Sequence, residues 1–443
     1  MNAVAGWTML VGGVANASCA ILGCYLVLRR MSLLGDAIGH SILPGIVLAF
    51  VFTGSLASPW MFVAAVMTGL LTTMLTQTLA SYGSVPEDVS MGVVFTSLFA
   101  LGVVLLTRLA SGADLDTDCV FYGSLDGVPL NLTRVLGYRL PVALPPMLFA
   151  LATTLVFVGL FWKELKLTAF DPALADAMGL RAALVHYLLM GMVALVTVAS
   201  FKALGAVLVT AMLIVPAATA HLLTERLGRM MLVAVAVAVI SAVVGYLVAV
   251  RLDTGVSGVM AAVAGAQFAL AVVFAPHHGL VSKTLANFSL NLRIMSEDLL
   301  AMLYRAEEPA GQAAAAVTWR RAARSLGGGF SAWLVALWLL RRGGLRLVHG
   351  WTLELTDRGR QAAQSLVRAH RLWEAYLGEH FQLPLDHLHE PAERIEHFLG
   401  PQLQEQLANE LRAPAVDPHG REIPAESGRA AEGERGSGGN ATG

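Results

Sequence analysis

Asp36 and His40 are two ionisable side chains inside an otherwise apolar stretch, the segment Arg29–Gly45, RRMSLLGDAIGHSILPG. Their spacing of four residues places both on one face of a helix. A carboxylate and an imidazole together suit a divalent ion such as Zn, Mn or Fe. Ionisable groups in a membrane segment are costly and usually functional. The pair is therefore a candidate site for a divalent metal; the alternative is that the two residues merely pair with each other or with a neighbouring helix.

Pro44 follows one turn after His40. It is expected to break the helix together with Gly45 and to free backbone carbonyls that face the same cavity. A broken membrane helix of this kind would add oxygen ligands to the carboxylate and the imidazole.

A second set of metal-ligand residue types lies near the end of the chain. His370 and Glu374 share one helix face, and four further residues lie on one face of the next helix or at its entry. Nitrogen and oxygen donors of these kinds suit Mn, Fe or Zn and not a soft thiolate site. A solvated charged face is the structural alternative. The four further residues are His389, Glu393, Glu396 and His397.

Composition divides the chain into two parts. Of its 443 residues 56% are hydrophobic and only 14% charged, and 18 of the 30 Lys and Arg residues follow Ala275. The N-terminal part is therefore membrane-compatible and the remainder resembles soluble protein. The three cysteines form no close cluster for a metal or a disulfide. The first 28 residues lack a basic start and a small-residue cleavage site, so we expect a retained first span.

Nine apolar windows are long enough to cross a bilayer, or eight if one of them is re-entrant. Most basic residues fall on one side of the membrane, and Asp114, Asp116 and Asp118 fall on the other. The positive-inside rule therefore places the segment after Phe274 in the cytoplasm. Lys202 and Arg251 are basic residues on the outer side, so the number of helices stays open by one. The windows are Trp7–Leu28, Leu33–Thr53, Trp60–Ala80, Val89–Thr107, Val142–Trp162, Val185–Phe201, Leu204–Ala220, Met230–Val250 and Val256–Phe274.

A short capped helix is expected between the fifth and sixth windows. Asp171 can cap it, Pro172 can take its first position, and Gly179 can end it. From the residues alone this is as easily a plain surface helix as a docking element.

Several of these segments resemble the metal-importing ABC permeases, the zinc, manganese and iron class. The resemblance rests on Arg30-Met31-Ser32-Leu33, Gly35-Asp36-Ala37, His40, Leu43-Pro44-Gly45, Phe170-Asp171-Pro172 with Met178-Gly179-Leu180, and Lys202–Ala220. It covers most of residues 7–280.

This resemblance implies a bacterial inner-membrane permease that works with partners. They are a separate ABC ATPase subunit, an extracytoplasmic metal-binding protein, a second permease subunit in a homodimer or heterodimer, and membrane lipid. Phe170, Asp171, Pro172 and Gly179 would receive the ATPase. The chain contains no G-x-x-x-x-G-K-S/T and no H-E-x-x-H. We therefore expect no bound nucleotide and no intramembrane zinc protease.

The cytoplasmic part is expected to begin as a winged helix. Three helices, Met295–Glu308, Ala313–Ser325 and Phe330–Arg342, precede a hairpin made of Leu345–Val348 and Trp351–Leu355. Three more helices follow, from Thr356, over Leu388–Leu399 and over Gln402–Leu411.

Residues 295–424 resemble the iron-dependent repressor family, which includes manganese sensors. The resemblance rests on the runs around His370 and around His389 to His397, and on Pro418-His419-Gly420. It implies metal binding and dimerisation, with Asp298 as a further ligand; Ala301 stands where the family has a second ligand on the first helix.

The would-be DNA-reading helix is apolar, FSAWLVALWLL, and offers almost no side chain that could read a base edge. Arginines beside it could contact phosphates, which positions a protein without specifying sequence. DNA is therefore a doubtful partner. These arginines are Arg320, Arg321, Arg324, Arg341, Arg342 and Arg346.

The predicted fold is an all-α polytopic membrane domain followed by a mainly α winged-helix domain and a helical metal-binding domain. We place these at 1–280, 290–355 and 356–424, with a disordered tail at 425–443. The predicted function is the permease subunit of an ATP-driven Mn, Zn or Fe importer with a metal-sensing domain. Alternatives are a membrane-held metal-dependent transcriptional regulator, a permease whose C-terminal part only dimerises, and a vitamin or siderophore permease.

Overall fold

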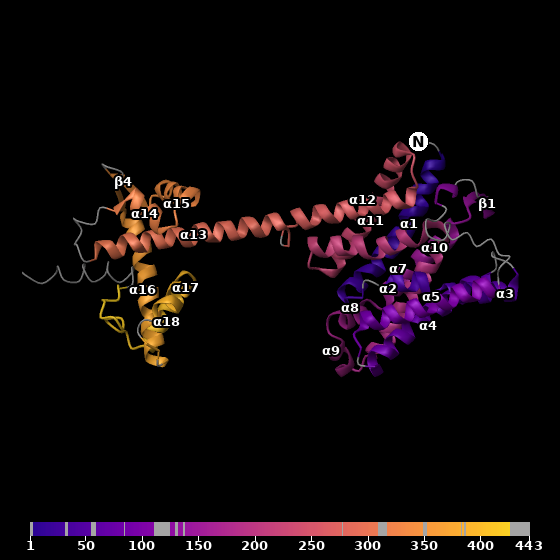
Figure 1. Cartoon of the computed structure of the whole chain (residues 1–443), viewed down its shortest axis with the longest axis horizontal. Helices are drawn as coiled ribbons and strands as arrows, with labels where there is room; N and C mark the ends of the chain where they lie inside the picture. The colour runs from indigo at the N-terminus through magenta and orange to yellow at the C-terminus, as the bar shows by residue number, and fades with distance from the viewer. Residues whose placement is uncertain are drawn as a thin grey trace, which may run out of the picture. The chain divides into compact units, whose positions relative to one another are not determined.

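The computed structural model describes residues 3–31, 34–54, 59–83, 85–109, 125–128, 132–135, 138–276, 278–308, 317–348, 352–381, 383–384 and 387–425. Asp114, Asp116, Asp118 and the tail from 426 onward lie outside them. The chain divides into two compact units, Met1–Lys283 and Thr284–Gly443 (Figure 1). We name them the membrane unit and the C-terminal unit and describe each by itself.

The membrane unit is a bundle of long apolar helices. Among the described residues, eight helical stretches are long and apolar enough to cross a membrane, and a ninth crossing would be the pair α7 and α8, which is bent by 76°. The prediction of eight or nine spans is therefore confirmed. The helices are α1 (Ala3–Leu28), α2 (Leu34–Ser41), α3 (Leu43–Thr53), α4 (Pro59–Gly83), α5 (Glu87–Leu109), α7 (Leu144–Leu160), α8 (Trp162–Phe170), α9 (Pro172–Ala177), α10 (Ala182–Leu223), α11 (Leu227–Leu252) and α12 (Val256–Phe274).

Helix α10 contains two of these spans, Ala182–Phe201 and Ala203–Leu223, each of which has the length of a crossing. Its backbone departs from helical geometry at Gly205, near the start of the second span. That residue has φ 78° and ψ 165°, a conformation open essentially only to glycine. A small two-stranded antiparallel sheet, β1 (Leu132–Val135) and β2 (Tyr138–Pro141), precedes α7.

Helices α1 and α10 form the centre of the membrane unit, where Leu22, Tyr25 and Leu208 are fully buried. Small residues let the helix backbones approach closely, as is usual where lipid provides no hydrophobic drive. A Cβ on Gly23 would lie 1.9 Å from the carbonyl oxygen of Leu213, so these two backbones are in direct contact.

The C-terminal unit begins as a winged helix. Its three-stranded antiparallel sheet has the order β3-β5-β4 and packs with three helices around Leu299, Val335 and Leu353. The elements are α13 (Leu280–Glu307), β3 (Val317–Thr318), α14 (Trp319–Ser325), α15 (Gly329–Arg341), β4 (Leu345–Val348) and β5 (Thr352–Leu355).

The sequence misplaced two boundaries in this region. Helix α13 begins at Leu280 and not at Met295, because apolar residues at helical spacing continue upstream through Val281, Leu285 and Phe288. The second helix begins only at Trp319, because Val317 and Thr318 pair with β5 instead.

The remaining helices are α16 (Asp357–His380), α17 (His389–Ile395), the 3-10 turn η3 (Glu396–Phe398) and α18 (Pro401–Glu410). The Thr356 hydroxyl accepts a hydrogen bond from the Gly359 N–H and so caps α16. Leu372, Ala408, Leu411 and Ile423 form a small core between α16 and α18. This core holds α16 in place, and α16 carries the first metal-ligand residues.

Candidate functional site: metal-ligand groups in both units

Asp36 and His40 both lie on α2 and form a pair. The His40 Nε2 and Asp36 Oδ1 atoms are 3.5 Å apart, and the side chains are 28% and 43% exposed. Thr210 on α10 hydrogen-bonds Asp36, and the ring of Phe99 on α5 stands edge-on to that of His40 with centroids 5.8 Å apart. The pair is therefore accessible but surrounded by three helices.

The span that carries this pair, Leu34–Thr53, is one crossing with a short interruption between α2 and α3. The break lies at Ile42, one residue after α2 ends, and Pro44 lies in the first turn of α3. We expected the break at Pro44 and Gly45; it comes slightly earlier because proline is favoured in the first turn of a new helix. Pro44 has no N–H to donate to the His40 carbonyl four residues before it. A backbone acceptor therefore accompanies the His40 side chain.

The predicted short helix between spans is present as α9. The Asp171 carboxylate accepts a hydrogen bond of 2.9 Å from the Leu174 N–H, and Pro172 takes the first helical position. Gly179 follows the helix with φ 82°. Phe170 and Met178 are 59% and 66% exposed. The segment thus presents apolar side chains on a capped, locally rigid element.

Sequence reasoning missed an arginine that ties this segment to the bundle. Arg29, just after α1, donates 2.7 Å to the Thr168 hydroxyl on α8 and contacts His186 Nδ1 on α10 at 2.9 Å. Its position beside Arg30 at the end of a span indicated only membrane orientation.

The first metal group of the C-terminal unit consists of His370 and Glu374 on α16 and His389 on α17. His370 Nε2 lies 3.1 Å from Glu374 Oε1 and 2.9 Å from His389 Nδ1. His370 and Glu374 are buried, whereas His389 is exposed. Three donors converge here on one point.

The second metal group consists of Asp298 on α13 with Glu396 and His397 on η3. His397 Nε2 lies 3.2 Å from Asp298 Oδ1, and His397 Nδ1 lies 2.8 Å from Glu297 Oε2. Glu396 also contacts His370 Nδ1, so the two groups are directly linked through one imidazole. A change at either group reaches the other.

Opposite charges shift the pKa values in both groups. Hydrogen bonds to Asp298 and Glu297 raise the pKa of His397 to about 9, against the effect of burial. Burial would raise the pKa of Glu374, but contacts with His370, His389 and His419 outweigh it and lower the pKa to about 2. Glu374 is thus an anion and His397 a cation near neutral pH in the absence of metal.

The donor chemistry of both groups fits a divalent ion. All six side chains offer oxygen or nitrogen, none offers a thiolate, and half of them are carboxylates that supply negative charge. Buried carboxylates and imidazoles that face one another are stabilised by a shared cation. These residues would hold Mn, Fe or Zn.

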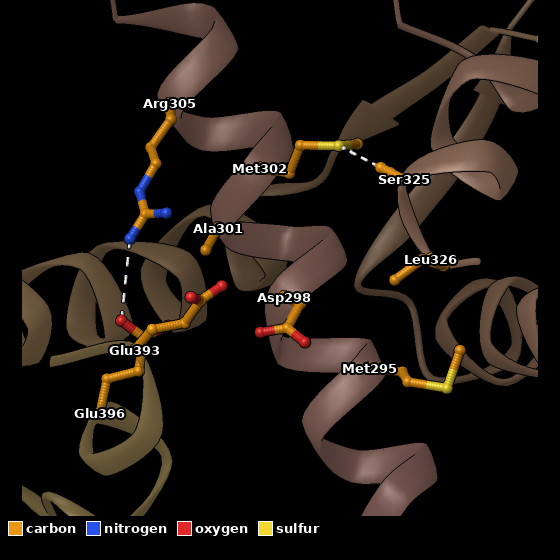
Figure 2. A pocket seen from close by; sticks show the side chains of 9 residues that line it. All are labelled: Met295, Asp298, Ala301, Met302, Arg305, Ser325, Leu326, Glu393 and Glu396. Atoms are coloured by element: carbon orange, nitrogen blue, oxygen red, sulfur yellow. Dashed lines mark hydrogen bonds and ion pairs between the residues drawn. The ribbon is translucent and has the colours of Figure 1, made fainter. Parts of the chain in front are cut away.

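A cavity of about 440 Å³ opens beside the second metal group (Figure 2). Ala301 lines it where the repressor resemblance calls for a ligand, and Glu393 lines it without belonging to either metal group. Arg305 also lines it, with its Nη2 atom 3.7 Å from Glu396 Oε2. A fixed positive charge thus lies beside Glu396, the carboxylate of the second group that contacts His370 of the first.

The structure separates residues that the sequence placed in one cluster. His389 joins His370 and Glu374, whereas Glu396 and His397 face Asp298, because α17 ends at Ile395 and the chain tightens into η3. Sequence reasoning did not predict that Arg305 and His419 lie beside the metal groups. The His419 Nε2 atom is 3.9 Å from Glu374 Oε1. His419 lies in the segment Pro418-His419-Gly420, but only the folded structure brings this segment next to α16.

The arginines proposed to contact phosphate are exposed. Arg320, Arg321 and Arg324 lie on α14, and Arg341 ends α15. Their neighbours on the outward face of α15 are tryptophan and leucine, which carry no hydrogen-bonding pattern for base edges.

Comparison with known proteins identifies the membrane unit. Residues 2–275 match the model of the ABC 3 transport family. The chain belongs to this family. The chain is 44% identical over 285 residues to the manganese transport system membrane protein MntD of Bacillus subtilis, covering 64% of this chain and 96% of that one. The structure of PsaBC from Streptococcus pneumoniae in complex with Fab is similar, with a TM-score of 0.53, 26% identity, and coverage of 63% of this chain and 94% of that chain.

The same comparisons cover the C-terminal unit. Residues 356–425 match the iron dependent repressor, metal binding and dimerisation domain. The zinc transport system membrane protein TroD of Treponema pallidum is 37% identical over 367 residues, covering 81% of this chain and 97% of that one. That alignment is longer than the membrane unit, so it continues into the C-terminal unit. This ABC 3 family member is thus a multi-pass membrane protein that carries a repressor-type domain.

Proposed function

We propose that this chain is the membrane subunit of an ATP-driven importer of a divalent transition-metal ion and that its C-terminal unit senses the same metal in the cytoplasm. The observation that carries the proposal is the presence of metal-ligand groups in both units, Asp36 with His40 in a broken span and two linked groups in the C-terminal unit. Transport would fall when the C-terminal groups fill.

The cargo is a Mn, Zn or Fe(II) ion. The relatives named above are described as manganese and zinc transport proteins. Asp36 and the neutral His40 imidazole offer one oxygen and one nitrogen, and the His40 carbonyl freed by Pro44 adds another oxygen. Few ligands on a partly exposed pair suit a site that must release its ion.

The partners are an ABC ATPase, an extracytoplasmic metal-binding protein and a second permease subunit. The exposed Phe170, Leu174 and Met178 around α9 support docking of the ATPase, because apolar side chains on a capped helix give a firm contact. The chain itself has no P-loop sequence. Energy for transport therefore comes from the partner subunit.

The regulatory step would act through α13. This helix begins at Leu280, soon after the span α12 ends at Phe274, and it carries Glu297 and Asp298. An ion held by Asp298, Glu396 and His397 fixes α13 against η3. The chain segment that leaves the last span would thereby lose freedom when metal is abundant.

The test is metal uptake by the full chain with its ATPase in proteoliposomes, at low and at high metal inside. We expect the double variant Glu396→Ala with His397→Ala to keep uptake at low metal and to lose inhibition at high metal. Glu390→Ala is the matched control, because Glu390 lies on α17, is 75% exposed and pairs with Arg394. It should inhibit like the unchanged protein.

The transport path is tested in the same assay. Asp36→Asn should reduce uptake at least tenfold, whereas Asp253→Asn should leave it unchanged, because Asp253 ends α11 in a left-handed conformation that asparagine accepts. Full uptake by Asp36→Asn would overturn the proposed path. Inhibition that persists without Glu396 and His397 would leave the C-terminal unit as a dimerising module, and metal-dependent binding of a specific operator by the full chain would favour a transcriptional regulator.

A further inference from the structure

The outward face of α15 is apolar and exposed. Trp333 and Trp338 are 51% and 39% exposed, and Leu334 and Leu337 between them are half-buried. The opposite face, with Ala332, Val335, Ala336 and Leu339, is buried against the core of the winged helix. Helix α15 is thus apolar on both faces, one of them buried and the other exposed to solvent over much of its area. At Ser331–Arg341 it is too short to cross a membrane.

Positive charge lies at the C-terminal end of this apolar face and in the sequence on either side of it. Residues 317–348 contain six arginines and neither aspartate nor glutamate. Arg341 and Arg342 are exposed at the end of α15, and the Arg342 guanidinium lies over the Trp338 ring at 4.2 Å. On β4, Leu347 is 48% exposed beside Arg346, which pairs with Glu354 at 2.8 Å. The apolar patch therefore has a basic rim.

We propose that this face, formed by Trp333, Leu334, Leu337 and Trp338 with Arg341 and Arg342, binds the anionic surface of the cytoplasmic leaflet. Tryptophan and leucine with arginine at the edge are the residues that settle at the boundary of a bilayer. Anionic headgroups attract the arginines. The covalent link to the membrane spans limits the distance between this face and such a surface.

Nucleic acid fits this face less well, although phosphate would attract the same arginines. A DNA-reading helix needs polar side chains directed at base edges, and the outward positions here hold tryptophan and leucine. The winged helix therefore has arginines that could contact phosphate groups, but the outward side chains of α15 are apolar and suit contact with lipid. The inference rests on the proposed cytoplasmic placement of the C-terminal unit.

The experiment measures membrane depth in the full chain reconstituted in nanodiscs. A nitroxide label is attached at Leu337→Cys after Cys19, Cys24 and Cys119 are replaced by alanine, and its collisions with oxygen and with a water-soluble nickel chelate are compared by electron paramagnetic resonance. Gln361→Cys is the matched control, because Gln361 is exposed on α16, away from this face.

In nanodiscs containing phosphatidylglycerol, we expect the label at position 337 to collide with oxygen and to be shielded from the nickel chelate. Shielding should be lost in pure phosphatidylcholine, at high salt, and in the double variant Arg341→Glu with Arg342→Glu. The label at position 361 should remain accessible to the chelate throughout.

Three results would overturn the inference. The first is free access of the nickel chelate to the label at position 337 in anionic nanodiscs. The second is a label shielded from both oxygen and chelate in every lipid and in detergent, which would indicate a contact with protein. The third is that one specific duplex DNA displaces the labelled face from the membrane and makes the label accessible to the chelate. Metal inhibition of uptake is measured on the same labelled proteins reconstituted in proteoliposomes. If metal inhibits uptake but the label at position 337 is not shielded, only the proposed lipid contact is wrong. If the label is shielded but metal does not inhibit uptake, only the proposed metal-sensing role is wrong.

Discussion

His397 shows how a single residue joins the structure to metal chemistry. Its ring contacts Glu297 and Asp298 on α13, and its neighbour Glu396 contacts His370 on α16. In the metal-free state a protonated His397 supplies positive charge to these carboxylates. A metal ion would take over that role, because metal ligation requires the neutral imidazole.

Metal binding by the C-terminal unit should therefore release a proton from His397. Its pKa is raised from 6.5 to about 9, so the charged form stabilises the metal-free fold fully below pH 6.5, and this stabilisation disappears as the pH rises through about 9. Metal affinity should accordingly increase from pH 6.5 toward pH 9. Calorimetric titration of the full chain in buffers of different ionisation enthalpy measures the released protons. His397→Gln should release about one proton fewer at pH 7; equal proton release would exclude this role.

At the scale of elements, close contact between backbones packs the helices of the membrane unit against one another, and a side-chain cap stabilises the short helix α9 between them. Gly23 meets the Leu213 carbonyl, whereas Gly13 on the same helix α1 has nothing within 4 Å of its would-be Cβ. The two glycines therefore differ in purpose although they look alike in the sequence.

Gly23→Ala should destabilise the membrane unit and Gly13→Ala should not. A methyl group forced against a backbone typically costs about 1–3 kcal/mol. The midpoint of thermal unfolding in detergent measures the effect. Equal midpoints for the two variants would mean that α1 and α10 can separate at no cost, contrary to the packing described.

The cap of α9 should matter for transport more than for folding. Asp171→Ala removes the bond to the Leu174 N–H, which is worth about 1 kcal/mol in typical helices, and loosens the element proposed to contact the ATPase. Uptake and metal-stimulated ATP hydrolysis should both fall. Asp171→Ser keeps a capping oxygen and should retain most activity, whereas a loss as large as that of alanine would point to the carboxylate charge instead.

At the scale of the whole molecule, the membrane and C-terminal units have separate cores and different ligand groups. Ion pairs tie the end of α13 to α16 within the C-terminal unit, with Arg371 Nη2 at 2.7 Å from Glu308 and Arg360 at 2.7 Å from Glu307. A metal ion bound as proposed by α13, α16 and η3 would therefore act on elements that are already tied together.

Metal should raise the thermal stability of the C-terminal unit. A ligand at one hundred times its dissociation constant adds about 2.7 kcal/mol to a single site. Scanning calorimetry of the full chain, with and without manganese, should show the increase in one transition. The Glu396→Ala, His397→Ala variant should lose most of it; an equal shift in that variant would place the stabilising ion elsewhere.

Local sequence was enough to predict the features that depend on residues close together along the chain. The spans follow from apolar runs, the cap of α9 from Asp171 and Pro172, and the pairing of Asp36 with His40 from a spacing of four residues. Helix boundaries were less secure. β3 was taken for helix, because its two residues pair with a strand that lies far along the chain.

By itself the sequence determined that this is a polytopic membrane protein with metal-ligand residues in two places, because bilayer thickness and helix periodicity act on short stretches. Only the tertiary structure decided how the C-terminal ligands divide between two linked groups, that Arg305 lies beside Glu396, and that the outward face of α15 is exposed. Each of these depends on side chains from distant elements meeting in space, and such contacts have no periodic signal in one chain.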